Sequence, residues 1–264
     1  MKTALTLTIV GAAGRMGRKL LELIAEYPDL TVVSLWESNG HRLLGQVEPS
    51  TGLVYAGNWS GITGDVVIDF TNRDGLLALL GDAPEAGYAL VSGSTGLSEA
   101  DLQRLADLSV KVPVFHASNM SIGIHVLHQL VREAVTQVGP DWDVELVEMH
   151  HRRKVDAPSG TALSLAQTAS AAAGGLQQVH GRSGEVGSRK PAELGVLALR
   201  GGDVVGEHEL ILAGPGEILR LKHSALSRTV FAAGALEAAR WVSRQQPGLY
   251  SMSHMMSDRQ ADTQ

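Results

Sequence analysis

The chain has 264 residues, of which 44% are hydrophobic and 19% charged, so it can bury a sizeable core in one large domain or two modest ones. Its formal net charge of −6 gives nucleic acid and anionic membranes no overall attraction, so an anionic ligand must be bound by a local cluster. The absence of cysteine excludes disulfides, thiolate metal sites and cysteine nucleophiles.

The opening stretch, MKTALTLTIVGAAG, has a lysine, a brief apolar run and small residues, as a secretory signal does. Two threonines interrupt the run, however, and a nucleotide-binding loop explains the small residues better. No segment approaches the roughly 18 apolar residues of a membrane span. We therefore predict a cytoplasmic protein.

Short β-branched runs alternate with helical patterns through the first half, which is typical of a parallel α/β sheet. The predicted strands cover residues 5–10, 30–37, 64–71, 88–95 and 112–119. Apolar residues from Met16 to Tyr27 recur at helical spacing, and Ser98 with Asp101 resembles a capping box for the helix that follows.

The second half has a different pattern, which predicts a sheet with antiparallel pairs. The predicted elements are a helix at 121–138, a strand at 143–150, an Ala-rich helix at 159–173, glycine-interrupted strands at 194–223 and a helix at 229–246. Hairpins are predicted around Gly201-Gly202 and around residues 214–216. The polar tail from Ser257 is predicted to fray.

The loop GAAGRMG lies between the first predicted strand and helix, where a dinucleotide fingerprint belongs. Gly11, Gly14 and Gly17 keep it thin, so a pyrophosphate can approach the helix amides, and Arg15 adds positive charge. Ala13 stands where the usual second glycine would be. The alternative is a plain tight turn.

Glu37 ends the second predicted strand, 20 residues beyond Gly17, where an acid can hold the ribose hydroxyls of a dinucleotide. An acid disfavours a 2′-phosphate at that place, and the next residue is Ser38. The alternative is a solvated strand end.

The segment EMHHRRKVDAPSGTA, residues 148–162, concentrates basic groups in an acidic chain. Pro158 fits an early helical position, which would leave the amides of Ser159, Gly160 and Thr161 as an anion cradle. The cations that precede the cradle are Arg152, Arg153 and Lys154. Together they predict a small dicarboxylate ligand, whereas a solvated basic loop is the alternative.

Two other interpretations of this segment have weaker support. Neighbouring histidines such as His150 and His151 rarely bind one ion, and neither cysteine nor an HExxH spacing supports zinc, so no metal is predicted. The net charge and three phenylalanines also argue against nucleic acid.

Residues 148–162 resemble the E-x-H-H-x-x-K-x-D-A-P-S-G-T-A signature of the dihydrodipicolinate (4-hydroxy-tetrahydrodipicolinate) reductases of bacterial lysine biosynthesis. The resemblance extends over nearly the whole chain, through GAAGRMG, VIDFT, GSTG at 93–96, ASNMSIG at 117–123 and RGGDVVGEH at 200–208. It implies NAD(P)H-dependent reduction of a cyclic imine dicarboxylate to tetrahydrodipicolinate, in the diaminopimelate route to lysine.

The resemblance also implies roles for individual residues. His150 would be the proton donor and Lys154 a second catalytic residue. The implied substrate-binding residues are His151, Lys154, Ser159, Gly160 and Thr161. The implied cofactor-binding residues are Gly11, Ala12, Ala13, Gly14, Arg15, Met16, Glu37, Phe70, Thr71, Gly93, Ser94, Thr95, Ala117, Ser118, Asn119 and Met120.

The family fold implied is α/β, with a Rossmann-like dinucleotide-binding domain at 1–120 and 229–264. A second α+β mixed-sheet domain at 121–228 would bind substrate and build a homotetramer. Many relatives have threonine where this chain has Ser94, and some have arginine where Ser38 stands. The second difference makes NADH the preferred cofactor and NADPH the alternative.

Three rival functions remain for comparison. A semialdehyde dehydrogenase needs a cysteine nucleophile, which this chain lacks. A dinucleotide sensor without chemistry gives no reason for His150 and Lys154 beside an anion cradle. An NAD(P)-dependent oxidoreductase acting on a related small cyclic dicarboxylate is the alternative enzyme.

Overall fold

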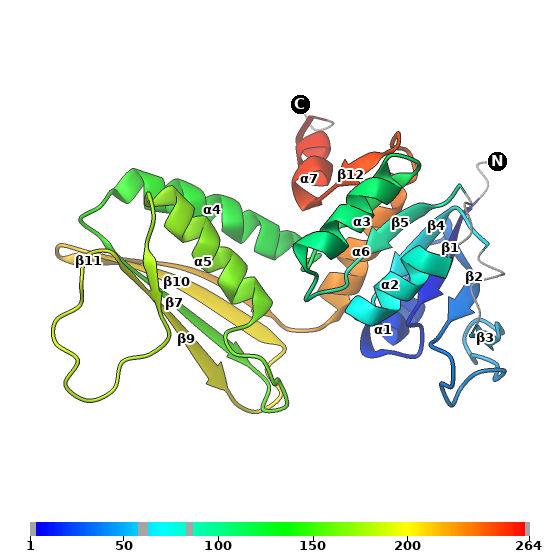
Figure 1. The fold of residues 1–264 in the computed structure, drawn as a ribbon, viewed down its shortest axis with the longest axis horizontal. Helices are drawn as coiled ribbons and strands as arrows, with labels where there is room; N and C mark the ends of the chain where they lie inside the picture. Colours follow the sequence, from blue (N-terminus) through cyan, green and yellow to red (C-terminus); the bar gives the residue numbers. More distant parts are fainter. Residues whose placement is uncertain (1–3, 58–62, 83–86, 262–264) are drawn as a thin grey trace. The chain divides into compact units, whose positions relative to one another are not determined.

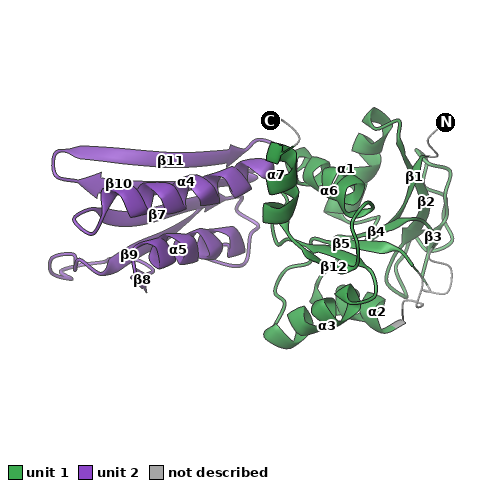
Figure 2. Cartoon of the chain, turned by 90° about the horizontal axis from the view of Figure 1, so that it is seen from above, with its two compact units in different colours: residues 1–120, 228–264 green, residues 121–227 purple. Residues whose placement is uncertain are grey.

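The computed structural model describes residues 4–57, 63–82 and 87–261. The chain forms two compact units, coloured in Figure 2: unit 1 comprises residues 1–120 and 228–264, and unit 2 comprises residues 121–227. Within the described ranges, no helix is both long and apolar enough to cross a membrane.

Unit 1 is built on a parallel sheet, as the alternating pattern predicts. Its seven strands run in the order β12-β6-β5-β4-β1-β2-β3, and every pair is parallel. The strands are β1 (Leu5–Val10), β2 (Leu30–Trp36), β3 (Tyr55–Ala56), β4 (Val66–Asp69), β5 (Ala89–Ser92), β6 (Pro113–His116) and β12 (Gly248–Tyr250). The central strands β4 and β5 are completely buried, so their apolar residues run continuously instead of alternating.

Helices cover both faces of this sheet, with α1 and α6 on one face and α2 and α3 on the other (Figures 1 and 2). The helical segments are α1 (Arg15–Leu23), η1 (Ile24–Glu26), α2 (Arg73–Asp82), α3 (Glu99–Ser109), α6 (Thr229–Val242) and α7 (Met252–Ala261). The capping box of Ser98 and Asp101 is confirmed at the start of α3. This arrangement is the doubly wound α/β fold.

Unit 2 is a mixed sheet with two helices on one face (Figure 1). Its elements are α4 (Ile122–Val138), β7 (Asp143–His150), α5 (Gly160–Ala172), β8 (Gln177–Val179), β9 (Glu193–Arg200), β10 (Gly206–Gly214) and β11 (Glu217–Ala225). The strand order is β11-β10-β7-β9-β8, in which β9 pairs in parallel with β7 and β10 pairs with it antiparallel. The predicted fold class, a Rossmann-like domain with a second mixed-sheet domain, is confirmed.

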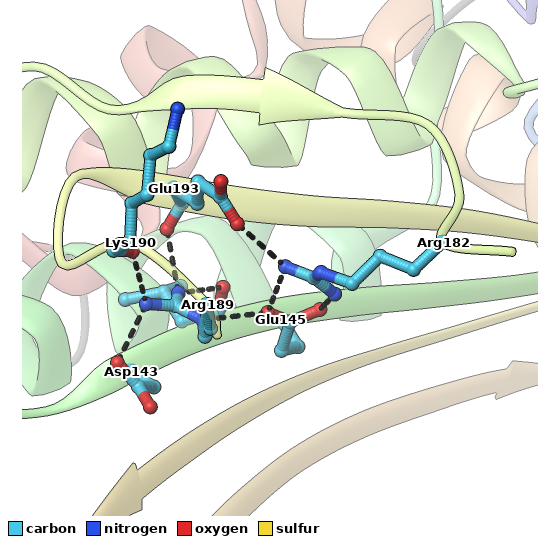
Figure 3. Close-up of polar contacts among 7 residues, drawn as sticks. Asp143, Glu145, Arg182, Arg189, Lys190 and Glu193 are labelled. Atoms are coloured by element: carbon cyan, nitrogen blue, oxygen red, sulfur yellow. Dashed lines mark hydrogen bonds and ion pairs between the residues drawn. The ribbon is translucent and has the colours of Figure 1, made fainter. Parts of the chain in front are cut away.

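Side chains alternate along β7, so its two faces have different environments. Val144 and Leu146 belong to the core beneath α4 and α5. On the opposite face, Glu145 accepts hydrogen bonds from Arg182 and Arg189, which lie in the connection between β8 and β9 (Figure 3). This ionic cluster attaches the long connection to the sheet.

Two predictions of local structure are wrong. The hairpin at residues 214–216 exists between β10 and β11, but none forms around Gly201-Gly202, because β7 lies between β9 and β10. The connection instead crosses the end of β7, where the Gly201 amide donates to the His150 carbonyl at 2.9 Å.

The predicted fraying from Ser257 is also wrong, because residues from Ser257 to Ala261 are helical. Asp258 accepts a hydrogen bond from Trp241, and Met255 of the same helix is buried. Residues 262–264 lie outside the described residues.

Candidate active site

The predicted cofactor-binding residues of unit 1 all follow the carboxyl ends of neighbouring parallel strands. Residues 11–16 follow β1, residues 70 and 71 follow β4, residues 93–95 follow β5, and residues 117–120 follow β6. β1 lies between β2 and β4, so the chain changes direction across the sheet at this point. The carboxyl edge beside such a switch point is where open α/β sheets bind ligands.

The glycine loop has the close packing that its sequence predicts. Gly11 has a φ of +75°, and its amide donates to the Trp36 carbonyl at 2.9 Å. A Cβ on Gly17 would lie 2.3 Å from the Gly11 carbonyl oxygen, so only glycine lets α1 approach the loop this closely. Little side-chain bulk covers the loop, which agrees with the prediction that a pyrophosphate binds there.

Glu37 reaches this loop directly. Its carboxylate accepts a hydrogen bond from the Ala13 amide at 2.6 Å. The acid is thus not simply a solvated strand end, since it is held beside the backbone that would carry the cofactor phosphates. Its role in binding the ribose hydroxyls stays a prediction.

Asp69, at the end of β4, joins the loops that follow β4 and β5, and the sequence did not indicate it. It is fully buried and accepts hydrogen bonds from Thr71 Oγ1, from Ser92 Oγ at 2.9 Å and from Ser94 Oγ at 2.8 Å. The serine at 94 thus retains a hydroxyl contact of the kind that a threonine would make. Gly93 packs on Phe70, whose ring lies where a Cβ would be.

The segment after β6 is tied to the same group of loops. The Ala117 amide donates to the Ser92 carbonyl at 3.2 Å. Met120 is buried, and its carbonyl oxygen lies only 1.8 Å from where a Cβ on Gly234 of α6 would be. Ser118 and Asn119 lie between these two fixed points and belong to the same edge of the sheet.

In unit 2, the centre of the predicted site is His150, the last residue of β7. Its Nδ1 donates to Glu148 Oε2 at 2.6 Å, since an ionised carboxylate can only accept. Glu148 is fully buried, yet hydrogen bonds from His150, Arg200 and the Ser159 amide outweigh burial and lower its pKa to about 2. Nε2 is therefore the His150 nitrogen left to exchange a proton with a ligand.

The start of α5 adjoins this pair. Ser159 is the N-cap, and its hydroxyl accepts from the Ala162 amide at 3.2 Å. The predicted cradle is smaller than expected, because the Ser159 amide donates to Glu148 Oε1 at 3.0 Å. Pro158 precedes the N-cap and is not part of the helix, so the cradle amides belong to Gly160 and Thr161.

His208 of β10 contacts both His150 and Ser159, and the sequence did not indicate it either. Its ring lies edge-on to that of His150, with the ring centroids 5.3 Å apart, and its Nε2 lies 3.1 Å from Ser159 Oγ. Burial, with the neighbouring His150 as the next cause, lowers the pKa of His208 to about 3. His208 is therefore neutral near pH 7.

The basic run after β7 is divided between different surroundings. Lys154 is half-buried, with Nζ 2.9 Å from Asp156 Oδ1, and His151 is buried. Arg152 and Arg153 are both exposed, and Arg153 pairs with Asp203 at 2.8 Å. Lys154 is thus the cation of this run held closest to the protein body.

Arg200 is a cation of the site that the sequence alone did not indicate. Its guanidinium binds both oxygens of Glu148 at 2.8 Å from β9. Residue spacing could have indicated Glu148, because i and i+2 share one face of a strand. Arg200 and His208 required knowledge of which strands neighbour β7.

The comparisons with known proteins cover nearly the whole chain. A family model described as Dihydrodipicolinate reductase, N-terminus, matches residues 5–120, and one described as Dihydrodipicolinate reductase, C-terminus, matches residues 123–256. The 4-hydroxy-tetrahydrodipicolinate reductase of Syntrophobacter fumaroxidans is 41% identical, over 94% of this chain and 97% of its own length. The enzyme of the same name from Rhodopseudomonas palustris is 39% identical, over 95% and 96%.

Solved structures support the fold. A dipicolinate-bound dihydrodipicolinate reductase from a Paenisporosarcina species has a TM-score of 0.74 at 22% identity, covering 94% of this chain and 98% of that chain. A myo-inositol dehydrogenase from Corynebacterium glutamicum has a TM-score of 0.56 at 16% identity, covering 93% and 90%. Two family models that together span nearly the entire chain, and relatives of about 40% identity over nearly their full lengths, agree: the chain belongs to the dihydrodipicolinate reductase family.

Proposed function

We propose that this chain is a 4-hydroxy-tetrahydrodipicolinate reductase, which reduces the cyclic imine dicarboxylate to tetrahydrodipicolinate in the diaminopimelate route to lysine. The single observation that carries the proposal is the His150–Glu148 pair beside the start of α5, in a chain whose family is established. A proton donor and anion-binding amides on one small surface suit a substrate that carries carboxylates and must be protonated.

Unit 1 is proposed to be the dinucleotide-binding domain and unit 2 the substrate-binding domain. NAD(P)H, when bound, supplies the hydride. In the proposed mechanism, Gly160, Thr161, His151 and Lys154 hold the substrate carboxylates. His150 delivers a proton from Nε2, and Lys154 stabilises negative charge on the ring as it develops.

The direct test is a coupled assay in which the cyclic substrate is generated freshly and the absorbance of NADH and of NADPH is followed separately. Oxidation that depends on the substrate is expected with at least one cofactor. Binding of NADH without such oxidation would favour a dinucleotide sensor. Oxidation with a different cyclic dicarboxylate alone would favour the alternative enzyme.

NADH is the proposed preferred cofactor, because Glu37 would repel a 2′-phosphate and Ser38 brings no compensating charge. Glu37→Ala should raise the dissociation constant of NADH about tenfold, since it removes the charged acceptor of the hydrogen bonds from the ribose hydroxyls, and should weaken NADPH binding less. Fluorescence titration of both cofactors measures this. Glu22→Ala, which removes an exposed acid of α1 paired with Lys19, is the matched control. An equal loss of affinity for the two cofactors would show that Glu37 does not bind the ribose.

We further propose that the protein is a cytoplasmic homotetramer assembled through unit 2. The sheet face opposite α4 and α5 carries apolar side chains that the chain leaves accessible, including Leu199 at 50% and Ile218 at 60% exposure. Such an apolar face supports assembly with other copies. Sedimentation equilibrium of the full chain measures the oligomeric state, and a monomer at micromolar concentration would refute the proposal.

A further inference from the structure

Glu148 is a fully buried carboxylate that the proposed proton transfer does not consume. A buried charge is costly unless it is paired and fully hydrogen-bonded. Glu148 meets both conditions, because its two oxygens accept hydrogen bonds from His150, Ser159 and both terminal nitrogens of Arg200. Its surroundings therefore favour the ionised form, which can only accept.

The two oxygens of Glu148 have separate partners. Oε2 accepts from His150 Nδ1 at 2.6 Å, and Oε1 accepts from the Ser159 amide at 3.0 Å. Each oxygen also accepts a hydrogen bond from one terminal nitrogen of Arg200, and each of these bonds is 2.8 Å long. A single side chain thus connects the end of β7, which carries the proton donor, to the N-cap of α5, which carries the anion-binding amides.

Arg200 is itself fixed in place. It stands opposite His150 in the register of β7 and β9, and its guanidinium also donates to the carbonyls of Leu199 and Asp156, each at 2.6 Å. Hydrogen bonding to Glu148 raises the pKa of Arg200. The carboxylate therefore has a permanent counter-charge and a fixed orientation before any ligand arrives.

The other ring nitrogen of His150, Nε2, has space beside it because residue 206 is a glycine. A Cβ on Gly206 would lie 3.0 Å from His150 Nε2, so glycine leaves space beside this atom. His208 packs edge-on against the same ring. Nδ1 is thus occupied, the ring plane is fixed, and Nε2 has room for a partner.

We propose that Glu148 is a positioning residue, which holds the proton of His150 Nδ1 so that Nε2 is the nitrogen that protonates the substrate. This inference rests on the proposed function. During the transfer, the Nε2–H bond of the imidazolium breaks and its electron pair stays on Nε2. The new C–H bond forms with the electron pair that hydride addition to the conjugated imine leaves on the substrate ring. The hydride comes from the reduced nicotinamide dinucleotide. His150, now neutral, keeps its Nδ1 proton and still donates it to Glu148 in a hydrogen bond. Glu148 stays ionised throughout.

The test is Glu148→Gln. The amide nitrogen of glutamine would donate to His150 Nδ1, which would move the proton of the neutral ring to Nε2 and remove the charge that stabilises the imidazolium. We expect kcat to fall about tenfold or more, while the dissociation constants of dipicolinate and of NADH change less than about threefold. A kcat within threefold of wild type would overturn the inference.

Glu145→Gln is the matched control. Glu145 also lies on β7 and is also bound by two arginines, but on the opposite face of the sheet (Figure 3). The substitution removes the same charge from the same strand, but away from His150, so its kcat should stay within about twofold of wild type. An equal loss of kcat in both variants would indicate a general structural effect and would refute the positioning role.

Nitrogen-15 NMR of histidine-labelled protein reads the tautomer without requiring turnover. His150→Gln assigns the resonances. The wild-type neutral ring should carry its proton on Nδ1 and the Glu148→Gln ring on Nε2, and an Nε2-protonated wild-type ring would overturn the inference even if the enzyme is active. This readout also separates the two proposals, since the tautomer can be as inferred in a chain that fails to reduce the cyclic imine. If Glu148→Gln does not fold, Glu148→Asp retracts the charge and should produce the same loss of kcat at unchanged dipicolinate affinity.

Discussion

Replacing His150 by glutamine is expected to lower kcat about a hundredfold or more and to leave the affinity for NADH nearly unchanged. Loss of a general acid commonly costs this much, whereas the predicted cofactor-binding residues lie in the other unit of the chain. Glutamine can still donate to Glu148 from its amide, so the buried carboxylate keeps a partner and the fold should survive. Steady-state kinetics and fluorescence titration of NADH measure the two effects.

A matched control exists within unit 2. His128 of α4 is a half-buried histidine, and its Nδ1 lies 2.8 Å from Thr168 Oγ1. It has no role in the proposed chemistry, so His128→Gln should keep kcat near the wild-type value. An unchanged kcat in His150→Gln would remove this residue from the role of proton donor.

The sequence predicts the fold where the pattern is local. Alternation of short apolar runs with helical periodicity predicts five strands of the parallel sheet of unit 1, but not its short strands β3 and β12. The Ser98 capping box is a purely local interaction. The order of strands in unit 2 could not be predicted from the sequence, because pairing between distant strands leaves no local pattern. The Gly201-Gly202 pair has the composition of a hairpin turn, yet it serves a connection that passes across β7.

The candidate site divides in the same way. His150, Ser159 and the residues between them come from one continuous segment, so their types and spacing were readable. Arg200 and His208 reach the same place from β9 and β10, 50 and 58 positions beyond His150 in the numbering, and only the sheet topology brings them there. The sequence alone therefore indicates a candidate proton donor and a candidate anion site, but not the hydrogen-bond network of Glu148 around them.

Unit 1 shows how one position can join fold and function. Gly17 lies in the first turn of α1, three residues beyond the N-cap Gly14. A Cβ at this position would lie 2.3 Å from the Gly11 carbonyl oxygen and 2.5 Å from Ala12 Cα. Both are backbone atoms of the loop that is proposed to bind the cofactor phosphates, so they cannot turn away as a flexible side chain could.

Gly17→Ala is therefore expected to destabilise the protein by about 1 to 3 kcal/mol, although alanine normally stabilises a helix interior by about 0.5 to 1 kcal/mol relative to glycine. The clash should decide the sign, because relieving it requires α1 or the loop to move. That movement separates the helix amides from the loop, so the dissociation constant of NADH should rise on the order of tenfold. Chemical denaturation and fluorescence titration measure the two quantities.

Gly81→Ala is the control, since Gly81 lies within α2 and a Cβ there would meet nothing within 4 Å. It should be neutral or stabilising and should leave NADH binding unchanged. If Gly17→Ala were as stable as Gly81→Ala and bound NADH normally, the loop would have room to spare. The close approach of α1 to the loop would then have no part in holding the cofactor.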